Sequence, residues 1–276
     1  MRKTAIRFTT IQKLTVFAYL LCVSLPAFEV LAVDDPTAIW LFDKKDNNVV
    51  KDLSGNGHDG KIHGAVDWTK DGQFSGALAF VGKDGWIEVD DHKNFHFPKG
   101  TDFTLACWVK ITGDHPQPPM LIAKSYGQGG QKQPWYALYY ANQGKQSDGD
   151  ISFFCRDAGG TSFHIAAGQK INDDKWHHVV GTRDNGTMYL YLDGEEKSKK
   201  TGADFDVGTH DGHLHMMTHA SRFMNAMLDE ALIYKGKALS KDEINQLMKD
   251  GTESFLSVSA EGKTTATWGR IKLIYR

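Results

Sequence analysis

The fold class is decided first by the stretch Trp176-His-His-Val-Val-Gly-Thr-Arg-Asp-Asn-Gly-Thr-Met-Tyr-Leu-Tyr-Leu-Asp-Gly194. Its two runs, 176–182 and 188–192, are rich in aromatic and β-branched residues, a composition typical of strands. Asn185-Gly186 lies between them and is the strongest short signal for a hairpin, because both central residues of such a turn need a positive φ. Asp193-Gly194 ends the second run in the same way. The stretch therefore predicts two antiparallel strands joined by a tight turn.

Runs of similar composition recur along most of the chain and are separated by turn residues. They cover residues 38–42, 77–80, 86–89, 103–111, 120–123, 135–140, 151–155 and 227–234. One segment, 240–249, has a helical pattern. Ser240 and Glu243 form a capping box at its start, and Gly251 stops it. Many short strands with one short C-terminal helix predict an all-β sandwich.

The N-terminal segment is typical of a signal peptide. Basic residues between positions 2 and 13 precede an apolar run, 14–28, and small residues at Val30 and Ala32 flank Leu31. The run is shorter than the roughly 20 residues that a membrane span requires, although a retained anchor is the alternative. We expect a signal peptide over residues 1–32 and an exported mature protein without a membrane span. Residues 33–251 then form the sandwich, and residues 252–276 form a tail or an appended strand.

The net charge and the cysteines bear on two questions: whether the protein binds nucleic acid and whether it has a disulfide. The formal net charge is −2, which argues against nucleic-acid binding, since that function needs clustered Lys and Arg. Cys107 and Cys155 each lie on the apolar side of a predicted strand. Export permits a disulfide between them, but two buried thiols fit the pattern as well.

Five stretches in order resemble the laminin-G-like, or concanavalin A-like lectin/glucanase, domains. They are residues 40–43, 52–60, 103–110, 176–194 and 228–244, and the resemblance covers about 36–250. It implies a jelly roll of two antiparallel sheets. One departure is the run His213-Leu-His-Met-Met-Thr-His219, which stands where the family usually has small residues. This fold carries lectins, glycosidases and adhesion modules, so the fold does not settle the activity.

The resemblance also implies a calcium site. In similar domains a calcium ion is held between the loop 52–60 and the strand that carries the acidic pair. Carried over to this chain, Asp52, Asn56 and Asp229 become the ligands, with Glu230 as a weaker candidate. Calcium prefers six to eight oxygen ligands, which such a loop supplies. The alternative is a tight turn in which the Asp and Asn side chains only cap backbone groups.

The histidines suggest a second metal hypothesis. His210, His213, His215 and His219 fall close together, and alternate imidazoles on one strand face can bind a transition metal. No Cys, Asp or Glu has a matching spacing in the sequence. The pattern therefore favours histidines without a metal.

Aromatic residues supply the candidate ligand site. Tyr126, Trp135, Tyr136 and Tyr139 flank a Gly/Gln loop, 127–133, and flat rings of this kind stack on sugars, although strand alternation must bury about half of them. The chain has no Glu-x-Asp-x-x-Glu pattern of a sandwich glucanase and no Gly-x-Ser-x-Gly motif. We therefore expect a non-catalytic module that binds a glycan or an extracellular protein surface. A secreted glycoside hydrolase and a purely structural surface component are the alternatives.

Overall fold

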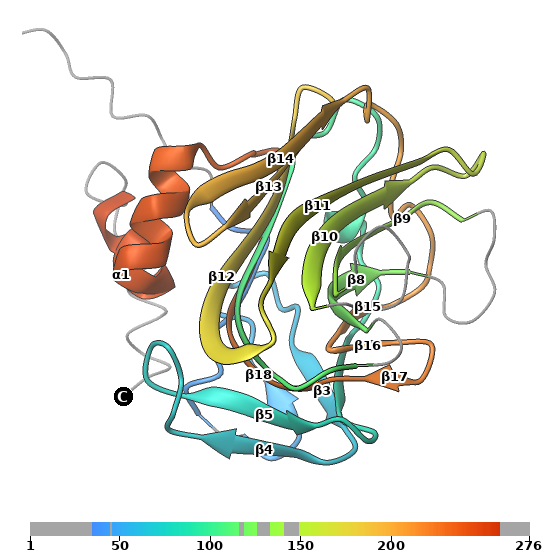
Figure 1. Cartoon of the computed structure of the whole chain (residues 1–276). Helices are drawn as coiled ribbons and strands as arrows, with labels where there is room; N and C mark the ends of the chain where they lie inside the picture. The colour runs from blue at the N-terminus through green and yellow to red at the C-terminus, as the bar shows by residue number, and fades with distance from the viewer. Residues whose placement is uncertain (1–34, 45, 116–118, 126–132, 141–148, 260–276) are drawn as a thin grey trace, which may run out of the picture. The chain divides into compact units, whose positions relative to one another are not determined.

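The computed structural model describes residues 35–44, 46–115, 119–125, 133–140 and 149–259 (Figure 1). Within these residues the strands form two eight-stranded antiparallel sheets. Sheet A contains, in spatial order, β14 (Glu195–Thr201), β13 (Thr187–Leu192), β12 (Asp173–Asp184), β7 (Phe103–Thr112), β18 (Asn225–Lys235), β5 (Ala77–Val81) and β4 (Val66–Thr69), with β1 (Ala38–Trp40) also paired to β18.

Sheet B lies against sheet A and contains β11 (Ser162–Lys170), β10 (Asp150–Arg156), β9 (Trp135–Tyr139), β8 (Met120–Lys124), β15 (Leu214–Met216), β6 (Trp86–Val89), β3 (Gly60–His63) and β2 (Val49–Val50). The remaining elements are a small hairpin, a 3-10 turn and a helix: β16 (Thr218–His219) with β17 (Arg222–Phe223), η1 (Lys93–Phe95) and α1 (Lys241–Ser259). The predicted all-β jelly-roll sandwich with a C-terminal helix is confirmed.

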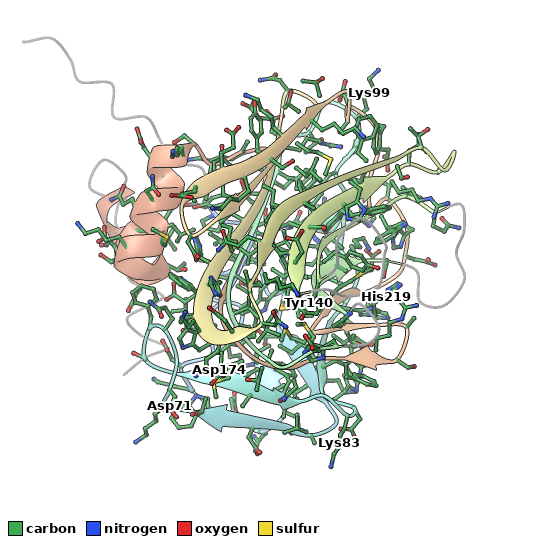
Figure 2. The ribbon with its side chains drawn as sticks, in the orientation of Figure 1. Asp71, Lys83, Lys99, Tyr140, Asp174 and His219 are labelled. Atoms are coloured by element: carbon green, nitrogen blue, oxygen red, sulfur yellow. The ribbon has the colours of Figure 1, made fainter. Side chains whose placement is uncertain are left out.

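The core fills the space between the two sheets, as the side chains in Figure 2 show. Along β7, Leu105, Cys107 and Val109 face this core, while Ala106 faces the opposite side of the sheet. This is the period of two that a strand imposes on its side chains. Cys107 and Cys155 are both buried free thiols, and burial raises the pKa of Cys155 to about 12. Of the two alternatives for these cysteines, the structure has the thiols.

Both predicted turns are present. Asn185 (φ 45°) and Gly186 (φ 71°) connect β12 to β13. Asp193 (φ 51°) and Gly194 (φ 77°) connect β13 to β14. Positive φ at both central positions is the conformation that matches the twist of the paired strands.

Helix α1 packs on the outer face of sheet A. Its capping box is formed as predicted: the Ser240 amide donates to Glu243 Oε2 at 2.8 Å, and the Glu243 amide donates to Ser240 Oγ at 3.3 Å. The side chains of Ile244, Leu247 and Phe255 join the apolar cluster on that face. Figure 1 shows the helix beside β12–β14, away from β8–β11.

Residues 252–259 are helical, which corrects the expectation of a tail or strand there. Gly251 (φ 74°, ψ 165°) interrupts the helix, as its predicted stop, but the chain resumes helical geometry after it. The reason is tertiary: the amide and hydroxyl of Thr252 both donate to Glu230 Oε2, at 2.7 and 2.8 Å, and Phe255 is buried. Residues 260–276 and the predicted signal peptide, 1–32, lie outside the described residues. Among the residues described, no helix has both the length and the apolarity needed to cross a bilayer.

Candidate functional site

The loop 52–60 uses its acidic side chain for its own structure. Asp52 Oδ1 accepts from the amides of Ile39 and Ser54, and Asp52 Oδ2 accepts from Ser54 Oγ and the His58 amide, at 2.8–3.0 Å. Asn56 Nδ2 donates to the carbonyls of Pro36 and Thr37. Each carboxylate oxygen of Asp52 thus already accepts two hydrogen bonds. The contacts are those of a capped turn, and Asp52 does not fit as a calcium ligand.

The other end of the expected calcium site is different. Asp229 is fully buried at a β-bulge of β18, where Glu230 has a φ of 45°. Its Oδ2 accepts from the Phe74 amide at 2.9 Å, whereas its buried Oδ1 has no hydrogen-bond partner among the described residues. A buried polar atom without a partner is costly. Asp229 therefore fits a cation.

The loop 72–76 faces this carboxylate and adds oxygen atoms. Gly72 is required there, because a Cβ at this position would lie 2.2 Å from the Gly76 carbonyl oxygen and 3.1 Å from Asp229 Oδ2. Asp43 Oδ1 accepts from the Gly76 amide at 2.9 Å. A second carboxylate and a carbonyl oxygen thus lie at the same loop as Asp229, the hard oxygen donors that calcium prefers.

The carboxylates at this bulge have perturbed pKa values. Burial raises the pKa of Asp229 to about 8, and the charges of Glu230 and Asp43 push it in the same direction. Burial also raises the pKa of Glu230 to about 7 and raises the pKa of Asp43. Neighbouring carboxylates destabilise one another's charged forms, and a bound cation would relieve that repulsion.

The aromatic segment divides between core and surface. Tyr136 is fully buried, donates its hydroxyl to the Phe95 carbonyl oxygen at 3.0 Å and packs on Phe97 and Phe103. The prediction that Tyr136 binds ligand is wrong, because strand alternation turns it into the core. Trp135 and Tyr139 point the other way and remain partly exposed. Tyr126 lies outside the described residues.

Trp135 and Tyr139 belong to the outer face of sheet B. Paired residues across an antiparallel sheet share a face. One such row runs across six strands of this sheet and is made of His164, Phe154, Ala137, Ala123, His215 and Glu88. Aromatic and imidazole side chains thus flank two alanines at the middle of the sheet.

Five partly exposed side chains on this face form what we call the open-face cluster: Trp135, Tyr139, Phe154, His164 and His219. The ring of Trp135 lies 4.0 Å from that of Phe154 and 6.0 Å from that of His219, nearly parallel to the latter at 8°. His164 lies edge-on to Tyr139 and Phe154. His219 comes from the β16–β17 hairpin (Figure 2). The cluster presents ring surfaces that originate from three strands and a hairpin.

The histidines of the open-face cluster are neutral at pH 7. Burial is the main cause that lowers the pKa of His164 and of His219 to about 4. His164 Nε2 is also buried and has no hydrogen-bond partner among the described residues. Neutral imidazoles offer both a donor and an acceptor nitrogen. The cluster therefore combines flat apolar rings with groups that can hydrogen-bond to hydroxyls.

Sequence reasoning missed Phe154 and His164 as members of this face. A signal was present for Phe154, since it alternates with the core residues Phe153 and Cys155. No comparable signal marked His164, because its strand, β11, is not among the strands that the sequence predicted. The structure groups them by pairing strands that are distant in the chain.

A cavity of about 420 Å³ lies elsewhere, on sheet A. Tyr189, Tyr191 and the turn 236–240 line it. Tyr191 is buried and packs in the same apolar cluster as helix α1. This cavity serves as a comparison for the open-face cluster in the experiments below.

Known proteins support the fold. No curated protein matches the chain significantly. Domain 4 of AbnA, a GH43 extracellular arabinanase from Geobacillus stearothermophilus in complex with arabinotriose, is 20% identical with a TM-score of 0.61; the match covers 78% of this chain and 98% of that one. The binding domain of Paraclostridial Mosquitocidal Protein 1 has 18% identity, a TM-score of 0.59 and coverages of 76% and 51%.

The botulinum neurotoxin serotype D ligand-binding domain, in complex with N-acetylneuraminic acid, is similar at 15% identity and a TM-score of 0.59, with coverages of 79% and 51%. The chain thus spans about half the length of the toxin domains, and identities this low establish the fold alone. The family profile described as the concanavalin A-like lectin/glucanases superfamily matches residues 81–245. Together with the two-sheet jelly roll, this match places the chain in the concanavalin A-like lectin/glucanase superfamily.

Proposed function

We propose that this protein is an exported, non-catalytic module that binds a glycan on the outer face of sheet B. The observation that carries the proposal is the open-face cluster, in which partly exposed rings from β9, β10 and β11 meet neutral imidazoles. Aromatic rings that stay exposed on a sheet give a flat apolar surface, and polar tips beside them give orientation. Sugars present both an apolar ring face and hydroxyl groups, so the two sets of groups match.

The similar solved structures support the ligand class. One is described in complex with arabinotriose and another in complex with N-acetylneuraminic acid. The alternative ligand is an extracellular protein surface, for which the described part of the open face offers no long apolar stripe. Export rests on the signal-peptide pattern of residues 1–32 and places the module where such glycans occur.

Calcium is part of the proposal as a structural ion. Asp229 and Asp43 would hold it beside the loop 72–76, in place of the expected pairing of Asp229 with Asp52 and Asn56. The support is the orphaned Asp229 Oδ1 and the oxygen atoms gathered around Gly72. Bound there, the ion would supply positive charge to buried carboxylates and tie the loop to the bulge of β18. It would take no part in binding sugar, since it lies on sheet A.

Catalysis is disfavoured by the exposure of the candidate acid. Glu88 and Asp90 have carboxylate oxygens within 4.8 Å of each other, close to the separation of about 5 Å used by retaining glycosidases. The Asp90 side chain, however, is 93% exposed. A carboxyl group this exposed lacks the buried surroundings in which enzymes place a general acid.

A glycan array and matched variants test the proposal. We expect wild-type protein, purified without residues 1–32, to bind a defined set of glycans and to release no sugar from them. Tyr139→Ala and Trp135→Ala should each weaken binding about tenfold, at the lower end of the 1–3 kcal/mol measured for aromatic stacking on bases. Both variants should stay folded and should lose less stability than a variant that truncates a fully buried ring.

Two neighbours serve as controls. Tyr136→Ala, one residue from Trp135, should destabilise the fold by about 3–5 kcal/mol as a large-to-small core change. Tyr189→Ala, at the cavity of sheet A, should leave glycan affinity unchanged. Loss of binding in Tyr189→Ala with full binding in Trp135→Ala would move the site to sheet A, and release of sugar would show an enzyme.

A further inference from the structure

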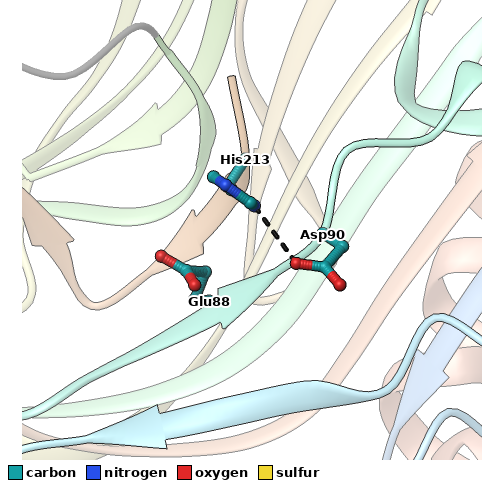
Figure 3. Close-up of side chains that lie close together, drawn as sticks. All are labelled: Glu88, Asp90 and His213. Carbon is teal, nitrogen blue, oxygen red and sulfur yellow. Dashed lines mark ion pairs between the residues drawn. The ribbon is translucent and has the colours of Figure 1, made fainter. Parts of the chain in front are cut away.

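A second cluster on sheet B brings together residues that are far apart in the sequence. Glu88 and Asp90 lie at alternate positions at the end of β6, and His213 immediately precedes β15, which pairs with β6. One carboxylate oxygen from each acid and one ring nitrogen of His213 all lie within 4.8 Å of one another. Figure 3 shows the three side chains close together, with the ion pair between His213 Nδ1 and Asp90 Oδ1 at 3.4 Å. The pairing of two strands thus supplies the acidic partners that the histidine run lacks in sequence.

The groups of this cluster make few contacts with one another. His213 Nδ1 is solvent-inaccessible and makes no hydrogen bond to any residue that the structure describes. A 3.4 Å approach to Asp90 is longer than a charge-assisted hydrogen bond, which measures 2.7–2.9 Å. Glu88 has a further imidazole on its other side, with His63 Nε2 at 3.6 Å from Glu88 Oε1. His63 Nε2 likewise makes no hydrogen bond. Two unbonded imidazole nitrogens thus flank one pair of carboxylates.

We infer that Glu88, Asp90 and His213 form a site for a first-row divalent transition ion, with Zn²⁺ as the best match. Imidazole nitrogen with carboxylate oxygen suits Zn²⁺, whereas Ca²⁺ and Mg²⁺ prefer oxygen alone. Three protein ligands leave one position of a tetrahedral zinc open. His213 and Asp90 are both solvent-accessible at the side-chain level, so that position can take water or an oxygen of a ligand.

The site is distinct from the proposed calcium site and does not depend on glycan binding. Asp229 lies on the other sheet, Asp43 lies in the segment after β1, and both offer oxygen atoms only. The zinc site lies on the outer face of sheet B, where His215, the cross-strand partner of Glu88, belongs to the same row as Phe154 and His164. A metal at this end of the row would extend the polar surface of that face.

Zinc binding by tag-free protein tests the inference directly. We expect Zn²⁺, titrated against a chromophoric chelator, to bind with one-to-one stoichiometry, and Ca²⁺ and Mg²⁺ not to compete. His213→Gln and Glu88→Gln should each weaken Zn²⁺ binding by about 100-fold, since loss of even an outer partner costs 10–100-fold. The spectrum of the Co²⁺-substituted protein should show a nitrogen- and oxygen-ligated tetrahedral ion, and this signal should disappear in His213→Gln.

Matched variants separate this site from others. His92→Gln replaces an exposed imidazole outside the cluster and should bind Zn²⁺ like the wild type, as should Asp229→Asn. The variants' folding is checked by their melting temperatures in EDTA. The inference is overturned if wild-type protein shows no saturable Zn²⁺ binding, or if folded His213→Gln and Glu88→Gln bind Zn²⁺ as tightly as the wild type.

Discussion

The outer faces of the two sheets differ in what covers them. On sheet A, Ile244, Leu247 and Phe255 of α1 pack on an apolar surface, and the central strand β7 is buried on both sides. On sheet B, the outer face keeps aromatic and imidazole side chains partly exposed within the described residues. A face with a helix on it contributes to stability, whereas an uncovered face with rings on it is available for recognition.

We expect the two sheets to differ in the same way in their contributions to stability and to binding. The proposed calcium site, at the bulge beside Glu230, lies on the covered sheet, where Glu230 also holds Thr252 of the helix. The open-face cluster and the proposed zinc site lie on the other sheet. Changes on the covered face should alter stability, and changes on the open face should alter binding.

Removing the helix contact should have the largest effect. Leu247 is buried against sheet A, and Leu247→Ala should lower the free energy of unfolding by about 2–5 kcal/mol. Lys249→Ala, an exposed position on the same helix, should change it by no more than about 0.5 kcal/mol. Chemical denaturation measures both, and glycan affinity under native conditions should stay at the wild-type level. A reduced affinity in folded Leu247→Ala would mean that the two faces are coupled.

Calcium should have the next largest effect. An ion bound only by the folded state stabilises it by about 2.7 kcal/mol when its concentration is a hundred times its dissociation constant. We expect wild-type protein to melt higher in Ca²⁺ than in EDTA, and Asp229→Asn to lose this difference. Asp52→Asn should melt lower in both solutions yet keep the difference, because Asp52 caps a turn. Equal melting of the wild type in both solutions would contradict the site.

Histidine titration should affect the stability of both faces and should not distinguish them. Burial is the main cause that lowers the pKa of His164 on sheet B and of His178 on sheet A to about 4. The unfolded chain, with a histidine pKa near 6.5, binds protons before the folded protein does, so stability falls as the pH drops from about 6.5 to 4. His164→Gln and His178→Gln should each make this fall shallower. An unchanged slope in both variants would exclude these histidines as its source.

Features that depend only on residues close together in the chain could be predicted from the sequence. The positive-φ turns at Asn185-Gly186 and Asp193-Gly194, the capping box of Ser240 and Glu243, and the alternation that makes strands are all local. Local conformational preference and the period-two burial of strand residues were therefore enough to predict the fold class. The five stretches that resemble laminin-G-like domains together indicated the family.

The sequence did not predict the polar segment that becomes a strand by pairing with a neighbour. β14 reads Glu-Glu-Lys-Ser-Lys-Lys-Thr and has no strand composition, yet it pairs with β13 at the edge of sheet A. An edge strand gains its backbone hydrogen bonds from one neighbour and faces water, so its residues need not be apolar. The helical segment after Gly251 is a similar case, since Thr252 is held by Glu230 from β18.

The candidate sites likewise depend partly on local sequence and partly on tertiary structure. The acidic residues of the sequence indicated both Asp52 and Asp229 as ligands, but only the tertiary structure shows how each is used. Asp52 accepts hydrogen bonds from its own turn, whereas Asp229 has a buried oxygen without a hydrogen-bond partner among the described residues. Alternation implied that half of the segment 135–140 is buried, and only the packing of Tyr136 on Phe97 shows which half. The sequence around His213 has no acidic residue at a matching spacing, and only the pairing of β15 with β6 brings Glu88 beside it. A chain determines local shape and composition by itself, whereas a site needs residues that only the pairing of distant strands brings within bonding distance.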